Sequence, residues 1–404
     1  MPGPLHGVRV LDLSRILAGP WAGQLLADLG AEVIKVERPE AGDDTRSWGP
    51  PFLPPAAGGP ARGESAYFLC ANRGKKSVTI DFAKPEGQEL VKRLAAQSDI
   101  LLENFKVDGL ARLGLGPADL AIVNPRLIYC SITGFGQTGP YRARPGYDFL
   151  MQGMGGLMSV TGEPDGAPMK VGVAVTDVFT GMYAATSVLA ALAERERSGL
   201  GQHVDIALFD VQIATLANQI MSYLVSGEQP PRLGNAHPSI VPYQVFPTQD
   251  GHAILAIGND EQFRRFTKLA GAPELALDAR FATNPARVTN RAVLIPLLEA
   301  LMRQRPTQSW IAELETVGVP CGPINNFADL EAHEQVRARG IFKTVPHPSA
   351  GSMRSVASPM RFSRTLVEDE RASPLLGADT QDVLGGMLGL SGEELDALRL
   401  AGVV

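Results

Sequence analysis

The chain has 404 residues, of which 45% are apolar and 20% charged, a balance typical of a globular protein with two or three domains. Its formal net charge of −6, with no offsetting lysine and arginine cluster, argues against a nucleic-acid partner. The sequence contains no run of about 18 apolar residues, so no membrane span is predicted, and no secretion signal is recognisable. Three widely spaced cysteines predict neither disulfides nor a zinc site, so we expect a cytoplasmic protein.

The first half of the chain alternates strand-like and helix-like segments. A strand over 8–14, a helix over 20–29 and a strand over 31–38 form a βαβ unit and predict a parallel sheet. The alternation continues with strands at 75–81, 99–105, 127–135 and 202–209, and helices at 85–97, 107–113 and 210–225. The predicted fold class is therefore α/β, with helices on both faces of the sheet.

The composition of the chain changes near residue 227. The stretch 227–242, GEQPPRLGNAHPSIVP, is rich in turn residues and indicates a linker or an active-site loop. Segment 243–258 alternates like a hairpin with Asp250-Gly251 at its turn, and helical segments follow. The expected division is a large domain over 1–226, a small domain over 227–330 and a C-terminal part over 331–404 that returns to the large domain.

The signatures of several enzyme classes are missing from the sequence. The turn after the first strand, SRILAGPWAG (14–23), lacks the glycines that let a backbone approach a dinucleotide, although the second strand ends at Glu37. There is no P-loop and no G-x-S-x-G motif, and the six histidines are scattered. We therefore expect neither a nucleotide redox cofactor nor a metal.

The stretch VAVTDVFTG (173–181) holds one carboxylate, Asp177. The preceding residues, 171–175, are expected to form a buried strand, and a helix should follow. Spacing alone favours Asp177, or Thr176, as the helix N-cap. A second interpretation makes Asp177 a covalent nucleophile, because the helix dipole favours its anion and ionised carboxylates can attack activated carbonyl groups. The residues alone leave both interpretations open.

Several stretches of the chain resemble the class III coenzyme A transferases of the CaiB/BaiF type. They are GVRVLDLSRILAGP (7–20), LGAEVIKVERPEAGDDTR (29–46), ENF (103–105), SITGFGQTGP (131–140), VAVTDVFTGMYA (173–184), GVPCGPINN (318–326) and PLLGADT (374–380). They occur in order over nearly the whole chain. The resemblance implies a Rossmann-like large domain with a smaller α+β domain, and ring-shaped subunits that interlock as a homodimer.

The same resemblance implies a chemical mechanism. Asp177 would be the catalytic nucleophile, and CoA would move through an aspartyl anhydride and an aspartyl-CoA thioester, so that CoA esters are substrates and no cofactor is needed. GDDTRSWGPPF (42–52) and AHPSIVPYQVF (236–246) resemble members that move CoA from succinyl-CoA to glutarate. A dicarboxylate is therefore the expected acceptor, and itaconate, malate, mesaconate and oxalate stay open.

Further site residues follow from the resemblance. The positions that match CoA contacts are Arg38, Ile80, Asp81, Phe82, Ala83, Asn104, Phe105, Arg112 and Arg144. Tyr147 and His237 are expected to contact the substrate. The distal carboxylate of a dicarboxylate needs an arginine partner, and the candidates are Arg46 as first choice, Arg15, Arg73 and Arg144. Core packing would explain Phe105 equally well, and a solvated charge would explain Arg38.

Two alternative functions remain at this stage. A 2-methylacyl-CoA racemase of the same superfamily would move a proton with a His-Asp pair, where this sequence has Tyr147-Asp148. A phenol, with an ordinary pKa of about 10, is a poor substitute for imidazole as a base, which argues against that chemistry. A non-enzymatic CoA-binding protein would bind a CoA ester without transferring it, and the acid at position 177 argues against that function.

Overall fold

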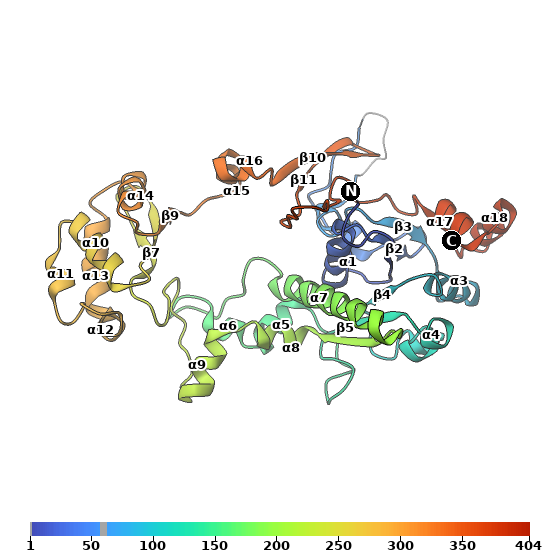
Figure 1. Ribbon diagram of the computed structural model, residues 1–404, viewed down its shortest axis with the longest axis horizontal. Coiled ribbons are helices and arrows are strands. Elements are labelled where there is room, and N and C mark those ends of the chain that lie inside the picture. The colour runs from blue at the N-terminus through green and yellow to red at the C-terminus, as the bar shows by residue number, and fades with distance from the viewer. Residues whose placement is uncertain (1, 57–62) are drawn as a thin grey trace. The chain divides into compact units, whose positions relative to one another are not determined.

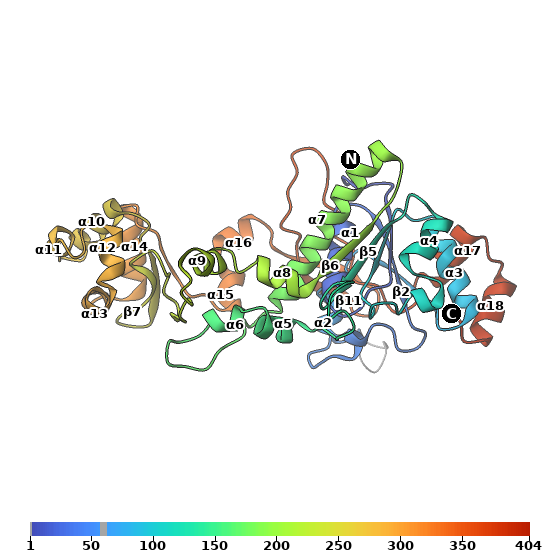
Figure 2. The same cartoon turned by 90° about the horizontal axis from the view of Figure 1, so that it is seen from below.

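The computed structural model describes residues 2–56 and 63–404 (Figures 1 and 2). The chain forms two compact units. Unit 1 comprises Met1–Leu157, Val171–Ile220 and Val336–Val404, and unit 2 comprises Met158–Lys170 and Met221–Gln335. Unit 1 is thus assembled from three separate segments of the chain.

A parallel sheet forms the centre of unit 1. Within the described residues it has six strands in the order β3-β2-β1-β4-β5-β6. Their bounds are β1 (Arg9–Asp12), β2 (Glu32–Glu37), β3 (Lys76–Thr79), β4 (Ile100–Glu103), β5 (Ile128–Thr133) and β6 (His203–Ala207). Each neighbouring pair is parallel, with Leu11 opposite Ile34 on one side and Leu101 on the other. The predicted parallel α/β fold is confirmed, and the strand order reverses between β1 and β4, where such sheets bind ligands.

Helices cover both faces of this sheet. Because side chains alternate along a strand, Leu11 and Val10 of β1 enter two different cores. The first core contains residues of α3 (Pro85–Ala95), α4 (Pro117–Val123), α17 (Thr380–Leu388) and α18 (Gly392–Leu400). The second contains residues of α1 (Ala18–Asp28), α5 (Asp148–Met154), α7 (Val175–Ser198) and α8 (Leu208–Ala214).

The last segment of the chain completes the β3 side of unit 1. The Ser77 amide of β3 donates to the Asp379 carboxylate over 2.8 Å, and the Asp81 amide donates to the Val403 carbonyl over 2.7 Å. Val403 is buried. The remaining elements of unit 1 are η1 (Asp44–Ser47), α2 (Ala66–Leu69), η2 (Ala111–Leu113) and the antiparallel pair β10 (Phe342–His347) and β11 (Gly351–Val356).

Three of the predicted elements differ from the structure. The helix expected over 107–113 is only the short 3₁₀ turn η2. The helix expected over 210–225 is two helices, α8 and α9 (Asn218–Ser226), because the backbone at Ala217 takes a positive φ of 47° that a continuous helix does not allow. The strand expected over 171–175 is wrong, since the chain there is irregular up to the start of α7.

Unit 2 contains a small antiparallel sheet and a group of helices. Its described residues form the sheet β7-β8-β9, and β7 and β8 pair as the hairpin that was predicted around Asp250-Gly251. The strands are β7 (Tyr243–Pro247), β8 (His252–Ala256) and β9 (Cys321–Pro323). The helices are α10 (Asp260–Leu269), α11 (Glu274–Leu277), α12 (Asn284–Thr289), α13 (Arg291–Met302), α14 (Thr307–Thr316) and α15 (Phe327–Ala332). Buried Phe246, Phe263 and Trp310 belong to its core. The helices α6 (Leu157–Val160) and α16 (Glu334–Ala338), like α9, span a boundary between the units.

Among the described residues one helix, α7, is long and apolar enough to cross a membrane by length and composition alone. In the structure α7 is a core helix of unit 1. Its buried residues Ala184, Ala185 and Val188 join the core that also contains residues of α1.

Candidate active site

Asp177 is the third residue of α7 and does not cap this helix. The N-cap residue is Ala174, and no side chain of its own caps the helix. The amide of Thr176 donates instead to the carboxylate of Asp148 at the start of α5, over 2.9 Å. The cap interpretation of Asp177 and Thr176 is therefore wrong. In the described part of the chain, no hydrogen bond to the Asp177 carboxylate is formed.

The surroundings of Asp177 disfavour its charge. Burial raises the pKa of its carboxyl group, and the nearby Asp148 carboxylate raises it further, to about 7. The phenol of Tyr67 in α2 also senses this carboxylate. Burial, and then the Asp177 charge, raise the pKa of Tyr67 to about 12. Near neutral pH the Asp177 carboxyl is thus divided between its neutral and its ionised form.

A glycine brings α7 into direct contact with α1 beside Asp177. Gly181 lies one turn after Asp177 on the same helix face. A Cβ atom at Gly181 would lie 2.6 Å from the Ala18 carbonyl oxygen and 3.0 Å from Trp21 Cβ. Only glycine permits this approach, which places the Asp177 face of α7 against the first turn of α1.

A cavity next to Asp177 lies at the carboxyl ends of β1, β4 and β5. It is lined by Asp177, Leu208 and four loop segments, namely 15–18 after β1, 104–107 after β4, 132–134 at the end of β5, and 142–147. We call it the Asp177 cavity. Ligands bind at this edge of open parallel sheets, at the point where the strand order reverses.

A second cavity adjoins the Asp177 cavity within unit 1. Its walls include the predicted CoA contacts Arg38, Ile80, Asp81, Phe82, Ala83 and Phe105. We call it the Arg38 cavity. Arg15 and Phe105 line both cavities, and the Arg15 guanidinium lies 5.0 Å from the centre of the Phe105 ring. The ring of Phe82 meets that of Phe105 edge-on at 5.6 Å.

Some of the other predicted site residues line one of the two cavities and others do not. Asn104, Arg144 and Tyr147 line the Asp177 cavity, whereas the exposed Arg112 lines neither cavity. The Asn104 side chain is used on the protein itself, since it accepts from the Arg15 amide over 2.9 Å and donates to the Arg15 carbonyl over 2.6 Å. His237 belongs to unit 2, where its Nδ1 accepts from the Ser239 amide.

Arg46, the first choice for the distal carboxylate, has another role in the structure. Its guanidinium binds both oxygens of Glu37 over 2.7 Å, pairs with Glu64 over 2.8 Å and lies on the Phe68 ring. Its side chain is 8% exposed and lines neither cavity. Four of its five N–H donors bind groups of the protein, so the structure does not support Arg46 as a substrate residue.

The remaining candidate arginines differ in whether they line the Asp177 cavity and in whether they form an ion pair. Arg73 is paired with Asp28 over 2.5 Å and lines neither cavity. Arg15 lines the Asp177 cavity but is paired with Asp44 over 3.0 Å. Arg144 lines the same cavity without an ion pair in the described residues, and its guanidinium lies 4.4 Å from the centre of the Tyr141 ring.

Sequence reasoning missed three residues around the Asp177 cavity. Arg142 lines the cavity and pairs with Asp108, Asp148 raises the Asp177 pKa, and Tyr67 lies close enough to sense the Asp177 charge. Asp148 was noticed only as part of the Tyr147-Asp148 pair. Nothing in the sequence around Tyr67 indicates its proximity to a residue 110 positions later.

Comparison with known proteins identifies the family. The family model of CoA-transferase family III matches residues 5–380. The chain belongs to CoA-transferase family III. Relatives of this family III chain include a succinate–glutarate CoA-transferase of Agrobacterium fabrum, 52% identical over 94% of this chain and 95% of that protein. A succinyl-CoA:glutarate CoA-transferase of Mus musculus is 43% identical over 99% of this chain and 90% of the relative.

A solved structure supports the fold of this family III enzyme. The crystal structure of a CaiB/BaiF family protein from Brucella suis is 51% identical, with a TM-score of 0.84 over 96% of this chain and 100% of that one. Within the described residues, no group of three or more His, Cys, Asp or Glu side chains is arranged to hold a metal ion.

Proposed function

We propose that this family III CoA-transferase moves CoA from succinyl-CoA to a dicarboxylate such as glutarate, with Asp177 as the nucleophile. The observation that carries the proposal is the Asp177 carboxylate, which lines a cavity at the ligand-binding edge of the sheet without a hydrogen-bond partner among the described residues. Its neighbours leave its oxygens available for a reacting carbonyl group. The names of the Agrobacterium and mouse relatives support the choice of donor and acceptor.

The reaction divides one exchange into steps of similar energy. The Asp177 carboxylate attacks the thioester carbon of succinyl-CoA, the C–S bond breaks, and a mixed anhydride and CoA thiolate form. The thiolate attacks the Asp177 acyl carbon, which frees succinate and leaves an aspartyl-CoA thioester. The glutarate carboxylate attacks this thioester and again frees the thiolate, which then attacks the glutaryl carbon and restores the Asp177 carboxylate. No proton, metal or further cofactor enters the balance.

The two cavities offer a place for each part of the CoA ester. Arg38, with 51% of its side chain exposed, and the backbone of 80–83 can contact the nucleotide in the Arg38 cavity, where guanidinium groups suit phosphate. The pantetheine arm would then pass Arg15 and Phe105, the wall that both cavities share, and bring the thioester to Asp177. In place of Arg46, we assign the distal carboxylate of the acceptor to Arg144, with Tyr147 beside it.

We further propose that the active form is a homodimer of ring-shaped, interlocked subunits in the cytoplasm. Phe179, Met182 and Tyr183 are between 40% and 48% exposed on one turn of α7, close in sequence to Asp177. Apolar side chains clustered in this way favour a protein interface. Water must also be kept from the anhydride intermediate, and a partner subunit over this face would help to exclude it.

A panel of donors and acceptors tests the function. The protein is incubated with succinyl-CoA and, separately, glutarate, itaconate, malate, mesaconate or oxalate, and the CoA esters are identified by mass spectrometry. We expect glutaryl-CoA, and hydroxylamine should trap Asp177 as a hydroxamate in the presence of succinyl-CoA. Asp177→Asn should abolish transfer with the fold intact. Binding of CoA esters without any transfer would contradict the proposal and leave a CoA-binding protein.

A further inference from the structure

The turn between β1 and α1 has a strained backbone beside Asp177. Residues 15–18 line the Asp177 cavity, and Ile16 among them has a φ of 73°. A β-branched residue avoids this left-handed region, and such strain persists only where the surroundings enforce it. The structure must therefore contain groups that hold Ile16 in place.

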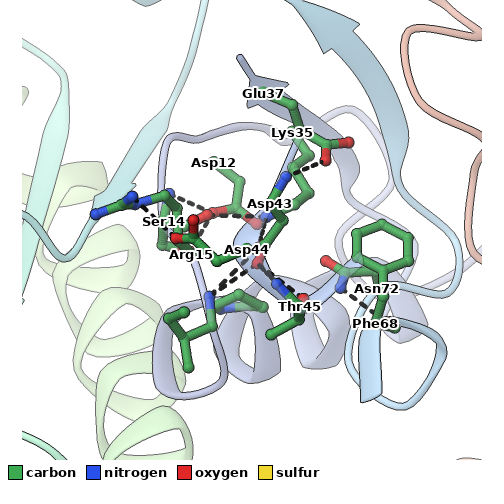
Figure 3. Close-up of polar contacts among 12 residues, drawn as sticks. Asp12, Ser14, Arg15, Lys35, Glu37, Asp43, Asp44, Thr45, Phe68 and Asn72 are labelled. Atoms are coloured by element: carbon green, nitrogen blue, oxygen red, sulfur yellow. Dashed lines mark hydrogen bonds and ion pairs between the residues drawn. The ribbon is translucent and has the colours of Figure 1, made fainter. Parts of the chain in front are cut away.

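Asp43 contacts the strained residue directly. The Ile16 amide donates to both oxygens of the Asp43 carboxylate, each over 3.3 Å. The same carboxylate accepts from the Thr45 amide over 3.0 Å and from the Thr45 hydroxyl over 2.8 Å. Figure 3 shows Asp43 between Lys35 and Thr45. Through these contacts Asp43 fixes the loop after β2 to the turn after β1.

Lys35 holds the Asp43 carboxylate from the other side. Its ammonium group lies 2.9 Å from Asp43 Oδ2 and donates to the Ser14 carbonyl over 2.8 Å, two residues before Ile16. The Lys35 and Asp43 side chains are both 0% exposed, and both residues belong to the wall of the Arg38 cavity. Burial alone would raise the pKa of Asp43, but Lys35 and the Thr45 hydrogen bonds lower it to about 2.

Further buried groups hold the two ends of the turn. Asp12 accepts from the Ser14 amide over 3.0 Å, and Lys75 donates to the Pro20 carbonyl over 2.9 Å. The Asn104 side chain binds both the amide and the carbonyl of Arg15. Asp43 is the group that binds the backbone of Ile16 itself, because the Ile16 amide donates to no other group in the described residues.

We propose that Asp43, held by Lys35, is a positioning residue that keeps Ile16 in its left-handed conformation and thereby sets the 15–18 turn against Asp177. The proposal rests on the proposed CoA transfer for its kinetic test. The pair would act on the reaction through the backbone that it fixes opposite Asp177, since neither residue lines the Asp177 cavity itself. A shift of about 1 Å in such a wall can change a rate about a hundredfold.

A cycle of variants tests whether the pair acts through residue 16. Lys35→Met/Asp43→Leu removes both charges together, so that no unpaired charge is left buried. Ile16→Gly is made in the wild type and in this variant, because glycine adopts a positive φ without strain. We expect removal of the pair to lower kcat for glutarate about a hundredfold when Ile16 is present, but only about tenfold or less in the Ile16→Gly background.

Two readouts separate this inference from a general loss of stability. Equal losses of kcat with Ile16 and in the Ile16→Gly background would overturn it. Asp28→Asn, which weakens the buried pair with Arg73 in the same unit, should lower the melting temperature while kcat stays as in the wild type. If the double replacement does not fold, the single change Asp43→Asn goes through the same cycle.

Crystal structures of the variants give a test that needs no turnover. Without the pair, Ile16 should leave the left-handed region, whereas the glycine of the Ile16→Gly variant should stay in it. An unchanged φ at Ile16 would contradict the inference even in an active enzyme. Conversely, a wild-type protein that transfers no CoA would contradict the proposed function and leave this structural test valid.

Discussion

At the scale of single residues, the main feature is the separation of Asp177 from the helix cap. At the start of α7 the Thr176 amide donates to Asp148, a residue of α5, and the Asp177 carboxylate keeps no hydrogen-bond partner among the described residues. The two carboxylates are close enough for Asp148 to raise the pKa of Asp177. One acid stabilises the helix and the other faces the cavity, and the first changes the protonation of the second.

The pKa of Asp177 predicts how turnover depends on pH. Only the ionised carboxylate can attack a thioester, so kcat/KM should fall as the pH decreases through about 7. Asp148→Asn keeps an oxygen for the Thr176 amide but removes the negative charge, and it should move this acid limb to lower pH. Rate profiles of the two proteins between about pH 5 and 9 measure the shift, with about half a unit as the smallest informative difference. Coincident profiles would show that Asp148 does not tune the nucleophile.

Stability gives a second measure of the same pKa. A carboxyl whose pKa is raised in the fold binds its proton more tightly in the folded than in the unfolded state, so its contribution to stability declines as the pH rises from about 4 to about 7. Asp177→Asn removes this penalty. The melting temperature of the variant relative to wild type should therefore be higher at about pH 8 than at about pH 4. A difference that does not change with pH would place the folded pKa near its ordinary value.

Arg144 carries a prediction about the acceptor. Arg144→Ala should raise KM for glutarate about tenfold or more, the loss expected for a charge-assisted hydrogen bond, and change KM for a monocarboxylate little. Arg144→Lys should restore part of the affinity, because it keeps the charge but not the planar fork. Steady-state kinetics with glutarate and butyrate measure both effects. An equal rise in KM for the two acids would assign Arg144 to another part of the substrate.

The residue scale also shows where sequence reasoning stops. Spacing around Asp177 favoured a helix cap, which is wrong, whereas the resemblance implied a nucleophile at Asp177 and placed Arg38 and Phe105 at positions that line one cavity. It could not foresee that Arg46 is neutralised by Glu37 and Glu64, because those partners come from a strand end and a separate loop. Glu37 and Glu64 are nine and eighteen residues from Arg46, and such pairs depend on how the loop between them folds, which local patterns do not contain.

At the scale of elements, the contact of α7 with α1 positions Asp177, the proposed nucleophile. The contact depends on Gly181, which leaves room for the Ala18 carbonyl. Apolar strand-like segments between helical ones were enough to predict the strands of the parallel sheet, and alternating apolar residues predicted the β7-β8 hairpin. It did not reveal the break between α8 and α9, since an apolar helical pattern continues through Ala217 and only the backbone conformation interrupts it.

Gly181→Ala should separate the two helices. The new methyl group would meet the Ala18 carbonyl oxygen at 2.6 Å, a backbone atom that cannot move aside alone. We expect a loss of about 1–3 kcal/mol in the free energy of unfolding, typical of an overpacked core, and a lower kcat as Asp177 moves from the 15–18 turn. Urea denaturation and steady-state kinetics measure the two effects.

Gly386→Ala is the matched control for this change. Gly386 lies in α17, and a Cβ atom there would meet no atom within 4 Å. Because alanine favours a helix over glycine, the free energy of unfolding should stay the same or rise by up to about 1 kcal/mol, with kcat unchanged. Similar losses in both variants would mean that the α7–α1 contact has no special role.

At the scale of the whole molecule, the exposed apolar turn of α7 predicts self-association. Met182→Lys places a charge on this turn and should lower the fraction of newly folded chains that assemble as a dimer, as measured by sedimentation velocity. Ile122→Lys changes an exposed apolar residue of α4 and should leave the dimer intact. A wild-type protein that sediments as a monomer would contradict the proposed assembly.

The construction of unit 1 from three chain segments has a consequence for its synthesis. Most of unit 2, residues 221–335, leaves the ribosome as one continuous stretch and can fold while translation continues. The β3 side of unit 1 cannot complete its hydrogen bonds at that point. Ser77 and Asp81 bond to Asp379 and Val403, which are made some three hundred residues later. The loop that forms one wall of the Arg38 cavity is thus among the later parts of unit 1 to reach its native state. The CoA binding proposed for this cavity would therefore require residues 379–403 to have been made.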